Sequence, residues 1–350
     1  MFGIERPALA VDFGSSYVAV ARGGVIPLLR ERSRVAFSFR KSLAGATTVP
    51  FSEGQVLAVG AQGEEECLNR PQTTRLAVPV TEGRLREPYA ATQLLKSLFH
   101  THQLASWRTR LFGGTVMILV PPDVRDLEKK AWIKAGEALN CGRVLTVDSL
   151  NAAIVGIGLD IREPRGQMVM DIGGGATRVA LYSLSEKVAL TCVPVGGDHL
   201  DRAILDYLRK RYRMNPSLQQ VEAIRMTLGS VFPKARPEFM ELSGADTSTG
   251  IVKKVTLDDN EIRDALLNAC EPLIGAITQT FEQVPPELAA DVAREAVTLI
   301  GGGALLSGLT SFLSERTGVS FRLAEDPQNA ALRGALRLLT QPLKPSLEPQ

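Results

Sequence analysis

The sequence predicts an α/β protein built from two similar halves. A motif of strand, glycine turn and returning strand occurs twice, once after Asp12 and once after Asp171. In both halves, apolar runs typical of buried strands alternate with segments of helical periodicity. We therefore expect sheets covered by helices, not an all-β design, and the 350 residues are enough for two domains with ample core.

Each copy of the repeated turn places an aspartate at the end of an apolar run. Asp12 is followed by the turn at 13–16, Asp171 by the turn at 172–177, and a second apolar run follows each turn. Glycine permits positive φ, which turns successive N–H groups the same way and lets a hairpin tip wrap a phosphate. A carboxylate at the strand end suits a hydrated Mg²⁺. We expect the two hairpins to hold the phosphates of one nucleotide, with Asp12 and Asp171 as metal ligands.

A third glycine turn supports this interpretation. The buried-strand run at 296–300 is followed by three glycines at 301–303, before a periodic segment at 305–317. A turn between a strand and a helix is a common place for the backbone to approach a flat ligand. We expect this turn to lie against the nucleoside.

The remaining elements follow from local patterns. Short strands are expected at 25–39, 56–59, 115–120 and 144–147. Apolar residues at helical spacing predict helices at 89–100 and 123–139, the second capped by Asp123. The last ten residues carry three prolines and are expected to form a loose tail.

Composition excludes several classes of function. The net charge of +2 gives no support for nucleic-acid binding, which needs a concentrated basic field. The four cysteines show no metal-ligand spacing, and three histidines make a histidine metal site unexpected. No apolar run approaches the ~20 residues that cross a bilayer. No signal peptide precedes Asp12, so we expect a cytoplasmic protein.

Together these motifs resemble the MreB family of bacterial actins, within the actin and heat-shock-chaperone ATPase superfamily. The resemblance runs from about Ala8 to Leu339 and is clearest after Val116. Besides the two hairpins, the segments that carry it are 120–122, 151–159, 196–201, 222–225, 285–289, 301–306 and 324–327. It implies an actin-like ATPase fold, with two ribonuclease-H-like domains around a nucleotide cleft and a smaller subdomain inserted in each.

The resemblance also implies domain boundaries. Domain I is expected at 1–146, with its inserted subdomain at about 33–75. Domain II is expected at 147–324, with its insertion at about 185–250. Residues 325–340 would return to domain I, and 341–350 would be the tail.

Roles of individual residues follow from the resemblance. Asp12 and Asp171 match the carboxylates on the Mg²⁺ side of ATP or ADP. Expected nucleotide contacts are Gly14, Ser15, Ser16, Tyr17, Gly173, Gly174, Gly175, Thr177, Gly197, Glu222, Arg225, Gly301, Gly302, Gly303 and Ala304. Without the family pattern, Glu222 and Arg225 would be interpreted as a solvated helix face.

The main departure from the family concerns hydrolysis. The family has Glu-Glu-Pro where this chain has Asp148, Ser149 and Leu150, and the second glutamate orients the attacking water. Serine is too short to replace it, so Ser149 is a degenerate catalytic position. Asp148 is the alternative catalytic group, and Thr177 also belongs to the expected catalytic set. Either a neighbouring polar group takes over and hydrolysis is slow, or the chain binds ATP without useful turnover.

Smaller departures occur in the hairpins. Tyr17 and Val18 stand where the family usually has Asn-Thr, and Arg178 stands where an acidic residue is common.

The segment 104–113 falls where the family carries a membrane-binding loop. Trp107, Leu111 and Phe112 are interleaved with two arginines, which suits the headgroup region of an anionic membrane. The alternative is that these apolar residues are core.

Three functions remain as alternatives. The first is an MreB-like cytoskeletal ATPase whose homopolymeric filaments bind the inner face of the cell membrane and organise cell-wall synthesis and rod shape. The second is a non-polymerising, nucleotide-gated adaptor of a division or envelope assembly complex. A chaperone-like ATPase is disfavoured because no substrate-binding domain follows the duplicated core.

Overall fold

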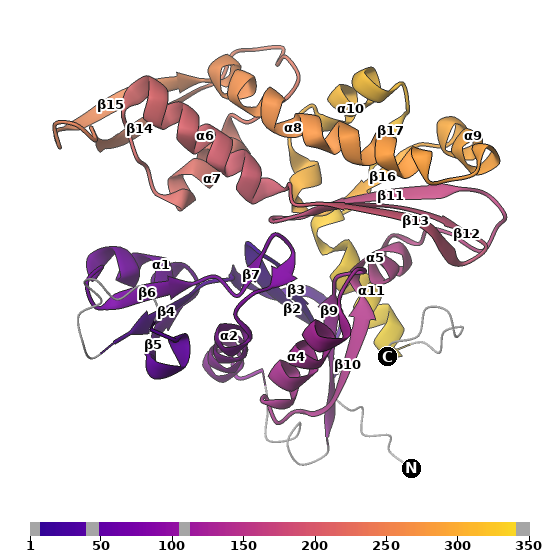
Figure 1. Cartoon of the computed structure of the whole chain (residues 1–350), viewed down its shortest axis with the longest axis horizontal. Helices are drawn as coiled ribbons and strands as arrows, with labels where there is room; N and C mark the ends of the chain where they lie inside the picture. The colour runs from indigo at the N-terminus through magenta and orange to yellow at the C-terminus, as the bar shows by residue number, and fades with distance from the viewer. Residues whose placement is uncertain (1–7, 40–48, 105–112, 341–350) are drawn as a thin grey trace. The chain divides into compact units, whose positions relative to one another are not determined.

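The computed structural model describes residues 8–39, 49–104 and 113–340. The chain divides into two compact units (Figure 1). Unit 1 takes the chain up to Leu159 and again from Asn329, and unit 2 takes Asp160–Gln328. Each unit contains a five-stranded sheet covered by helices, so the predicted α/β class is confirmed.

The main sheet of unit 1 has the order β10-β9-β1-β2-β3. β1 pairs antiparallel with β2, and β2 with β3, whereas β1, β9 and β10 are parallel. The strands are β1 (Ala8–Phe13), β2 (Tyr17–Arg22), β3 (Val25–Arg32), β9 (Gly114–Val120) and β10 (Gly142–Asp148).

Helices cover both faces of this sheet, which explains why its strands read as nearly continuous apolar runs. On β1, Leu9 and Val11 join the core with α2 (Pro88–Thr101) and α4 (Asp126–Glu137). Ala10 joins the core of the opposite face with α5 (Ser149–Ile157) and α11 (Ala330–Thr340). This alternation follows from the two-residue period of a strand.

Unit 1 also contains smaller sheets. The three-stranded sheet β5-β4-β6 carries helix α1, and β7 and β8 form a short hairpin. Their bounds are β4 (Val35–Ser38), η1 (Phe51–Glu53), β5 (Gln55–Val59), α1 (Gly60–Asn69), β6 (Thr74–Ala77), β7 (Val80–Thr81) and β8 (Arg84–Leu85).

The main sheet of unit 2 repeats the topology of unit 1. Its order is β13-β12-β11-β16-β17, with β11, β12 and β13 antiparallel and β11, β16 and β17 parallel. The strands are β11 (Gln167–Ile172), β12 (Thr177–Ser183), β13 (Glu186–Val193), β16 (Val297–Ile300) and β17 (Phe321–Leu323). The internal duplication seen in the hairpin sequences therefore extends to the whole sheet.

The helices of unit 2 build one core on its sheet. They are α6 (Gly197–Tyr212), α7 (Leu218–Thr227), α8 (Asp259–Glu282), α9 (Pro286–Arg294), η2 (Gly302–Leu305) and α10 (Leu309–Thr317). The antiparallel pair β14 (Phe239–Ala245) and β15 (Val252–Asp258) stands apart from the main sheet. Since 186–193 form β13 of the main sheet, the chain departs from the repeated topology only from α6 onward.

The two helices that flank unit 2 in sequence, α5 and α11, cross at very short distance within unit 1. A Cβ added to Gly334 would lie 1.6 Å from the carbonyl oxygen of Ala152, and one added to Gly156 would lie 1.9 Å from that of Ala330. The guanidinium of Arg337 donates to the carbonyl of Val155 at 2.7 Å. Because of this packing, α5 belongs to unit 1. The chain passes from unit 1 to unit 2 after Leu159, whereas we expected the domain boundary near 146.

One sequence prediction about a helix start was wrong. Helix α4 begins at Asp126 with Arg125 as N-cap, and no side chain caps it. The carboxylate of Asp123 instead pairs with Arg84, which also donates to the carbonyl of Asp123 at 2.8 Å. An ion pair with β8 has replaced the predicted cap.

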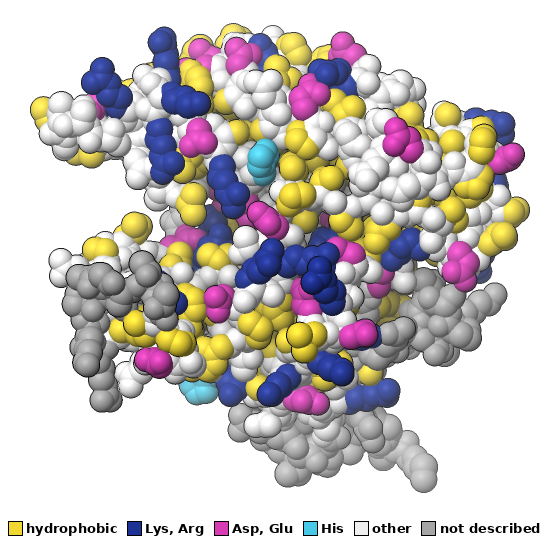
Figure 2. All heavy atoms as spheres, in the orientation of Figure 1, with side chains coloured by type: hydrophobic (Ala, Val, Ile, Leu, Met, Phe, Trp, Pro, Cys, Tyr) yellow, Lys and Arg dark blue, Asp and Glu magenta, His cyan; other side chains and the backbone are white. Residues whose placement is uncertain are grey.

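The surface is mixed in character. Figure 2 shows acidic, basic and hydrophobic side chains interspersed over the face that it draws, with Lys and Arg frequent over α6, β14 and β15. Among the described helices, none combines the length and the apolar character needed to span a bilayer.

Candidate functional site

The first predicted hairpin is formed by β1 and β2. Asp12 lies opposite Ala19 near the end of β1, and the N–H of Gly14 donates to the carbonyl of Tyr17 at 2.9 Å. A Cβ on Gly14 would lie 3.0 Å from that same oxygen, so the tight turn favours glycine. The side chain of Asp12 is half-buried.

The tip of this hairpin is held by residues that the sequence did not single out. Ser15 is 4% exposed, and its hydroxyl accepts a hydrogen bond from the N–H of Gly83 in the β7–β8 turn. The guanidinium of Arg34 donates to the carbonyl of Ser15 at 2.9 Å. The N–H of Ser33 donates to the carbonyl of Ser16 at 2.9 Å. The Ser15 hydroxyl is thus engaged within unit 1, and the expected contact of Ser15 with the nucleotide stays a prediction.

The second hairpin, between β11 and β12, has the same turn. The N–H of Gly173 donates to the carbonyl of Ala176 at 3.0 Å, as Gly14 does to Tyr17. Asp171 is half-buried, like Asp12, and pairs across the strands with Arg178. Cross-strand neighbours lie within ~5.5 Å at Cβ, so the side chains of Arg178 and the expected metal ligand leave the sheet on the same face.

Thr177 follows this turn and is completely buried. Its hydroxyl donates to the carbonyl of Val195 at 2.6 Å. In this structure the side chain therefore ties β12 to the main chain of the segment before α6. Its expected role in catalysis stays a prediction.

The first turn of α6 is built onto the second hairpin. The N–H of Gly197 donates to the carbonyl of Gly173 at 3.0 Å, and the N–H of Asp198 donates to that of Gly174 at 2.8 Å. A Cβ on Gly196 would lie 2.4 Å from the carbonyl oxygen of Gly173. Gly196 is thus explained by close approach to the hairpin, whereas a Cβ on Gly197 would make only ordinary contacts, the nearest at 3.5 Å.

These bonds fix the direction of the hairpin amides. In a trans peptide the carbonyl and the following N–H point to opposite sides. Because the carbonyls of Gly173 and Gly174 face the start of α6, the N–H groups of Gly174 and Gly175 face the other way. Successive amides aligned in this manner form an anion-binding concavity.

Glu222 and Arg225 lie in a buried ion-pair cluster beside the same helix. Arg225 Nε donates to Asp201 Oδ1 at 2.6 Å, and Arg225 Nη2 lies 3.6 Å from Glu222 Oε1. Asp201 and Glu222 are each 8% exposed. The interpretation of Glu222 and Arg225 as a solvated helix face is therefore wrong. Asp201, which completes the cluster, was missed because nothing local marks it as a partner of α7.

Burial dominates the ionisation of Asp201. Desolvation raises the pKa of Asp201 to about 6, the Arg225 guanidinium opposes that shift, and Glu222 adds to it. Arg225 also lies next to the hairpin-contacting helix start, since a Cβ on Gly197 would lie 3.5 Å from its Nη2.

The third glycine turn packs on the end of β11. A Cβ on Gly301 would lie 2.5 Å from Asp171 Oδ1, and one on Gly303 would lie 2.4 Å from the side chain of Ile172. Gly301 also has a φ of +85°. These glycines are explained by close packing within unit 2, whereas Gly302 meets only the side chain of Gln328, at 3.4 Å. Ala304 is buried in the same short helix, η2.

The two candidate catalytic residues lie at the junction of β10 and α5. Asp148 is the N-cap of α5, and its Oδ1 accepts from the N–H groups of Leu150 at 2.8 Å and Asn151 at 3.2 Å. Ser149 is the first residue of the helix. An N-cap carboxylate stabilises a helix start by satisfying otherwise unpaired amides. Capping therefore accounts for Asp148 without a catalytic role.

The donor set fits Mg²⁺ only in company with phosphate. The described residues hold no group of three or more His, Cys, Asp or Glu placed to bind a metal ion. Mg²⁺ usually takes one or two carboxylates and completes its shell with phosphate oxygens and water. A single strand-end carboxylate in each hairpin suits that mode.

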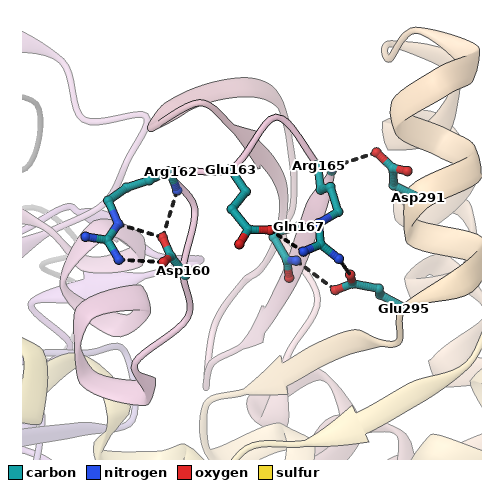
Figure 3. A network of polar contacts seen from close by, with 8 residues as sticks. Asp160, Arg162, Glu163, Arg165, Gln167, Asp291 and Glu295 are labelled. Atoms are coloured by element: carbon teal, nitrogen blue, oxygen red, sulfur yellow. Dashed lines mark hydrogen bonds and ion pairs between the residues drawn. The ribbon is translucent and has the colours of Figure 1, made fainter.

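A polar network, also missed by sequence reasoning, anchors the start of unit 2 (Figure 3). Arg165 bonds Glu163 at 2.7 Å and Glu295 at 3.2 Å, and Glu295 also accepts from Gln167 at 2.7 Å. The N–H of Gly166 donates to Asp291 of α9 at 3.1 Å.

The residues expected to bind membrane, Trp107, Leu111 and Phe112, lie outside the described residues.

Known proteins share this architecture. The structure superposes on MreB5 of Spiroplasma citri bound to ADP with a TM-score of 0.83 and 25% identity, covering 96% of this chain and 97% of that one. It also superposes on the MamK double helical filament with a TM-score of 0.71 and 18% identity, covering 97% and 100%. The duplicated sheets and hairpins thus define an actin-like protein, as the sequence predicted.

Sequence comparison narrows the class to a family. The MreB/Mbl protein model matches residues 6–346. The chain is 31% identical to the cell shape-determining protein MreB of Escherichia coli strain K12 over 338 residues, covering 96% of this chain and 94% of the relative. It is 29% identical to the cell shape-determining protein Mbl of Bacillus subtilis over 327 residues, covering 93% of each. The chain belongs to the MreB/Mbl family.

Proposed function

We propose that this chain binds ATP and ADP with Mg²⁺ through its two glycine hairpins. The observation that carries the proposal is the identical turn in both units. A hydrogen bond from the N–H of Gly14 to the carbonyl of Tyr17 closes the first turn, and one from Gly173 to Ala176 closes the second. Each of these two glycines stands two residues after an aspartate. Relatives solved as complexes support it, since MreB5 of Spiroplasma citri is bound to ADP in one structure and to AMPPNP in another.

Calorimetry with ATP and Mg²⁺ tests this proposal. Asp171→Ala removes the carboxylate and leaves the turn bonds of Gly173 in place, so the fold should persist while Mg²⁺-dependent binding is lost. Glu238→Ala, which removes an exposed carboxylate paired with Lys234 in the same unit, is the matched control. Unchanged ATP affinity in Asp171→Ala would refute the proposal.

The function proposed for the cell is that of a cytoskeletal filament that organises cell-wall synthesis and rod shape. Membership of the family supports this proposal, because the curated relatives are cell shape-determining proteins. MamK, which has the same fold, forms a double helical filament. Head-to-tail contacts between identical subunits produce such open polymers. Negative-stain imaging with ATP, with and without lipid, separates this function from that of a nucleotide-gated adaptor, which would stay monomeric under all conditions.

We further propose that the filament binds the inner face of the cell membrane through Trp107, Leu111 and Phe112. Partial burial of three large apolar side chains contributes several kcal/mol, at ~1.5–3 kcal/mol for each one fully buried. Co-sedimentation with anionic liposomes of the wild type and a Trp107→Ser, Phe112→Ser variant tests the assignment. Equal pelleting of both proteins would contradict it.

Hydrolysis is proposed to be slow. Ser149 offers no carboxylate to orient water, and Asp148 is bound to the start of α5. Phosphoryl transfer depends mostly on positioning and electrostatics, so loss of one water-orienting residue lowers the rate by some ~10²–10⁴-fold without removing nucleotide binding.

A further inference from the structure

The two hairpins have the same turn but are supported by different groups. In unit 2 the carbonyl of Gly174, the second residue of the turn, accepts from the N–H of Asp198 at the start of α6. The equivalent residue of unit 1 is Ser15, and its carbonyl accepts from the guanidinium of Arg34. An arginine side chain in unit 1 therefore occupies the place of a helix amide in unit 2.

This substitution has a direct effect on the direction of an amide. The peptide between Ser15 and Ser16 is planar, so a carbonyl held toward Arg34 turns the N–H of Ser16 to the opposite side. The carbonyl of Ser16 is fixed in turn by the N–H of Ser33. The N–H groups expected to receive phosphate are thus oriented from behind, as they are in the second hairpin.

Arg34 is itself held by a buried carboxylate. Arg34 is 6% exposed and Glu64 of α1 is 8% exposed, and Arg34 Nε lies 3.1 Å from Glu64 Oε1. A second cation, Arg32, approaches Glu64 Oε2 at 3.9 Å. A buried ion pair is a weak device for stability alone, because desolvation of both charges offsets most of their attraction. Its geometry suggests a different use.

We propose that Arg34 and Glu64 are positioning residues for phosphate binding by the first hairpin. Glu64 orients the guanidinium, the guanidinium holds the Ser15 carbonyl, and the carbonyl sets the direction of the Ser16 N–H. The position of α1 is thereby coupled to retention of the nucleotide. This inference rests on the proposed nucleotide binding.

The test separates positioning from stability with paired variants. Arg34→Met removes the guanidinium and leaves the buried Glu64 without its 3.1 Å partner. Arg34→Met combined with Glu64→Leu removes both charges and refills the space with apolar atoms. Release of a fluorescent N-methylanthraniloyl ATP, bound with Mg²⁺ and chased with unlabelled ATP, is measured for each, together with thermal unfolding without nucleotide. Arg70→Met is the control, because it breaks the pair between the exposed Arg70 and the half-buried Glu66 on the same helix.

Arg34→Met should lose thermal stability and release nucleotide ~10-fold faster or more, the change that ~1.4 kcal/mol produces. The double variant should regain most of the stability, since the Glu64 carboxylate no longer stays buried without the Arg34 guanidinium. Its release should remain fast, because Ser15 still lacks its donor, and Arg70→Met should behave as the wild type. Wild-type release from the double variant, or release rates that simply follow stability, would overturn the inference and leave the proposed function intact. Failure of the wild type to bind the probe would overturn both.

Discussion

The crossing of α5 and α11 predicts a large effect of one added methyl group. In Gly334→Ala the new Cβ would lie 1.6 Å from the carbonyl oxygen and 2.5 Å from the carbonyl carbon of Ala152. It would also lie 2.8 Å from the amide nitrogen of Gly156. All three obstacles are main chain, so no rotamer change relieves the overlap. The helices must separate until the closest contact reaches at least 3.0 Å.

Two opposing effects set the size of the change. Forcing an extra methyl group into a packed interface costs ~1–3 kcal/mol, and a main-chain obstacle places this case near ~3 kcal/mol. Replacing Gly by Ala inside a helix returns ~1 kcal/mol. The steric cost therefore exceeds the gain, and we expect unit 1 to lose ~2 kcal/mol in its free energy of unfolding.

Thermal and urea unfolding measure this loss. A loss of ~2 kcal/mol lowers the Tm by ~4–8 °C for a unit of this size. Gly275→Ala is the matched control, since Gly275 lies inside α8 and a Cβ there would meet nothing within 4 Å. That control should be stabilised by ~1 kcal/mol. A Gly334→Ala protein as stable as the wild type would show that the crossing is looser than the structure indicates.

Three further predictions concern the candidate site. Ser149→Glu should raise steady-state phosphate release, whereas Asp148→Asn should leave it unchanged because asparagine also caps helices well. Loss of phosphate release in Asp148→Asn would assign catalysis to Asp148. Arg178→Gln removes the cation opposite Asp171, so the Mg²⁺ concentration that gives half-maximal nucleotide binding should fall. A Mg²⁺ titration measures this concentration, and an unchanged value would refute a charge effect. Burial raises the pKa of Asp201 from 3.8 to about 6, so its protonation should stabilise the fold as the pH falls from 6 to 4. Asp201→Asn should lack that gain in unfolding free energy, and identical pH profiles would contradict the assignment.

The sequence was sufficient to predict the strands that carry the site. Apolar runs place Asp12 near the end of β1 and Asp171 near the end of β11, and a glycine two residues after each aspartate marks the turn. These features are local, because strand period and turn chemistry depend on neighbouring residues only. Family resemblance then added the actin-like fold, which superposition confirmed.

The supports of the site could not be predicted in the same way. Tertiary packing brings Arg34, Gly83 and Asp201 to their partners. No local sequence pattern predicts such contacts. Asp123 shows the reverse error, since its local pattern favours a helix cap and an ion pair with Arg84 prevailed. Tertiary contacts commonly override local preference.

The division of the chain imposes an order on its synthesis. Helix α11, which brings Leu332, Ala335 and Leu336 to the core formed with Ala10 and Met117, is translated after all of unit 2. At ~5–20 residues per second, the ribosome needs roughly 10–30 s to pass through Asp160–Gln328. At the end of that interval unit 2 has its complete sequence, while one face of the unit 1 sheet still lacks α11, one of its two covering helices. In the nascent chain, the unit that begins first is therefore the one that is completed last.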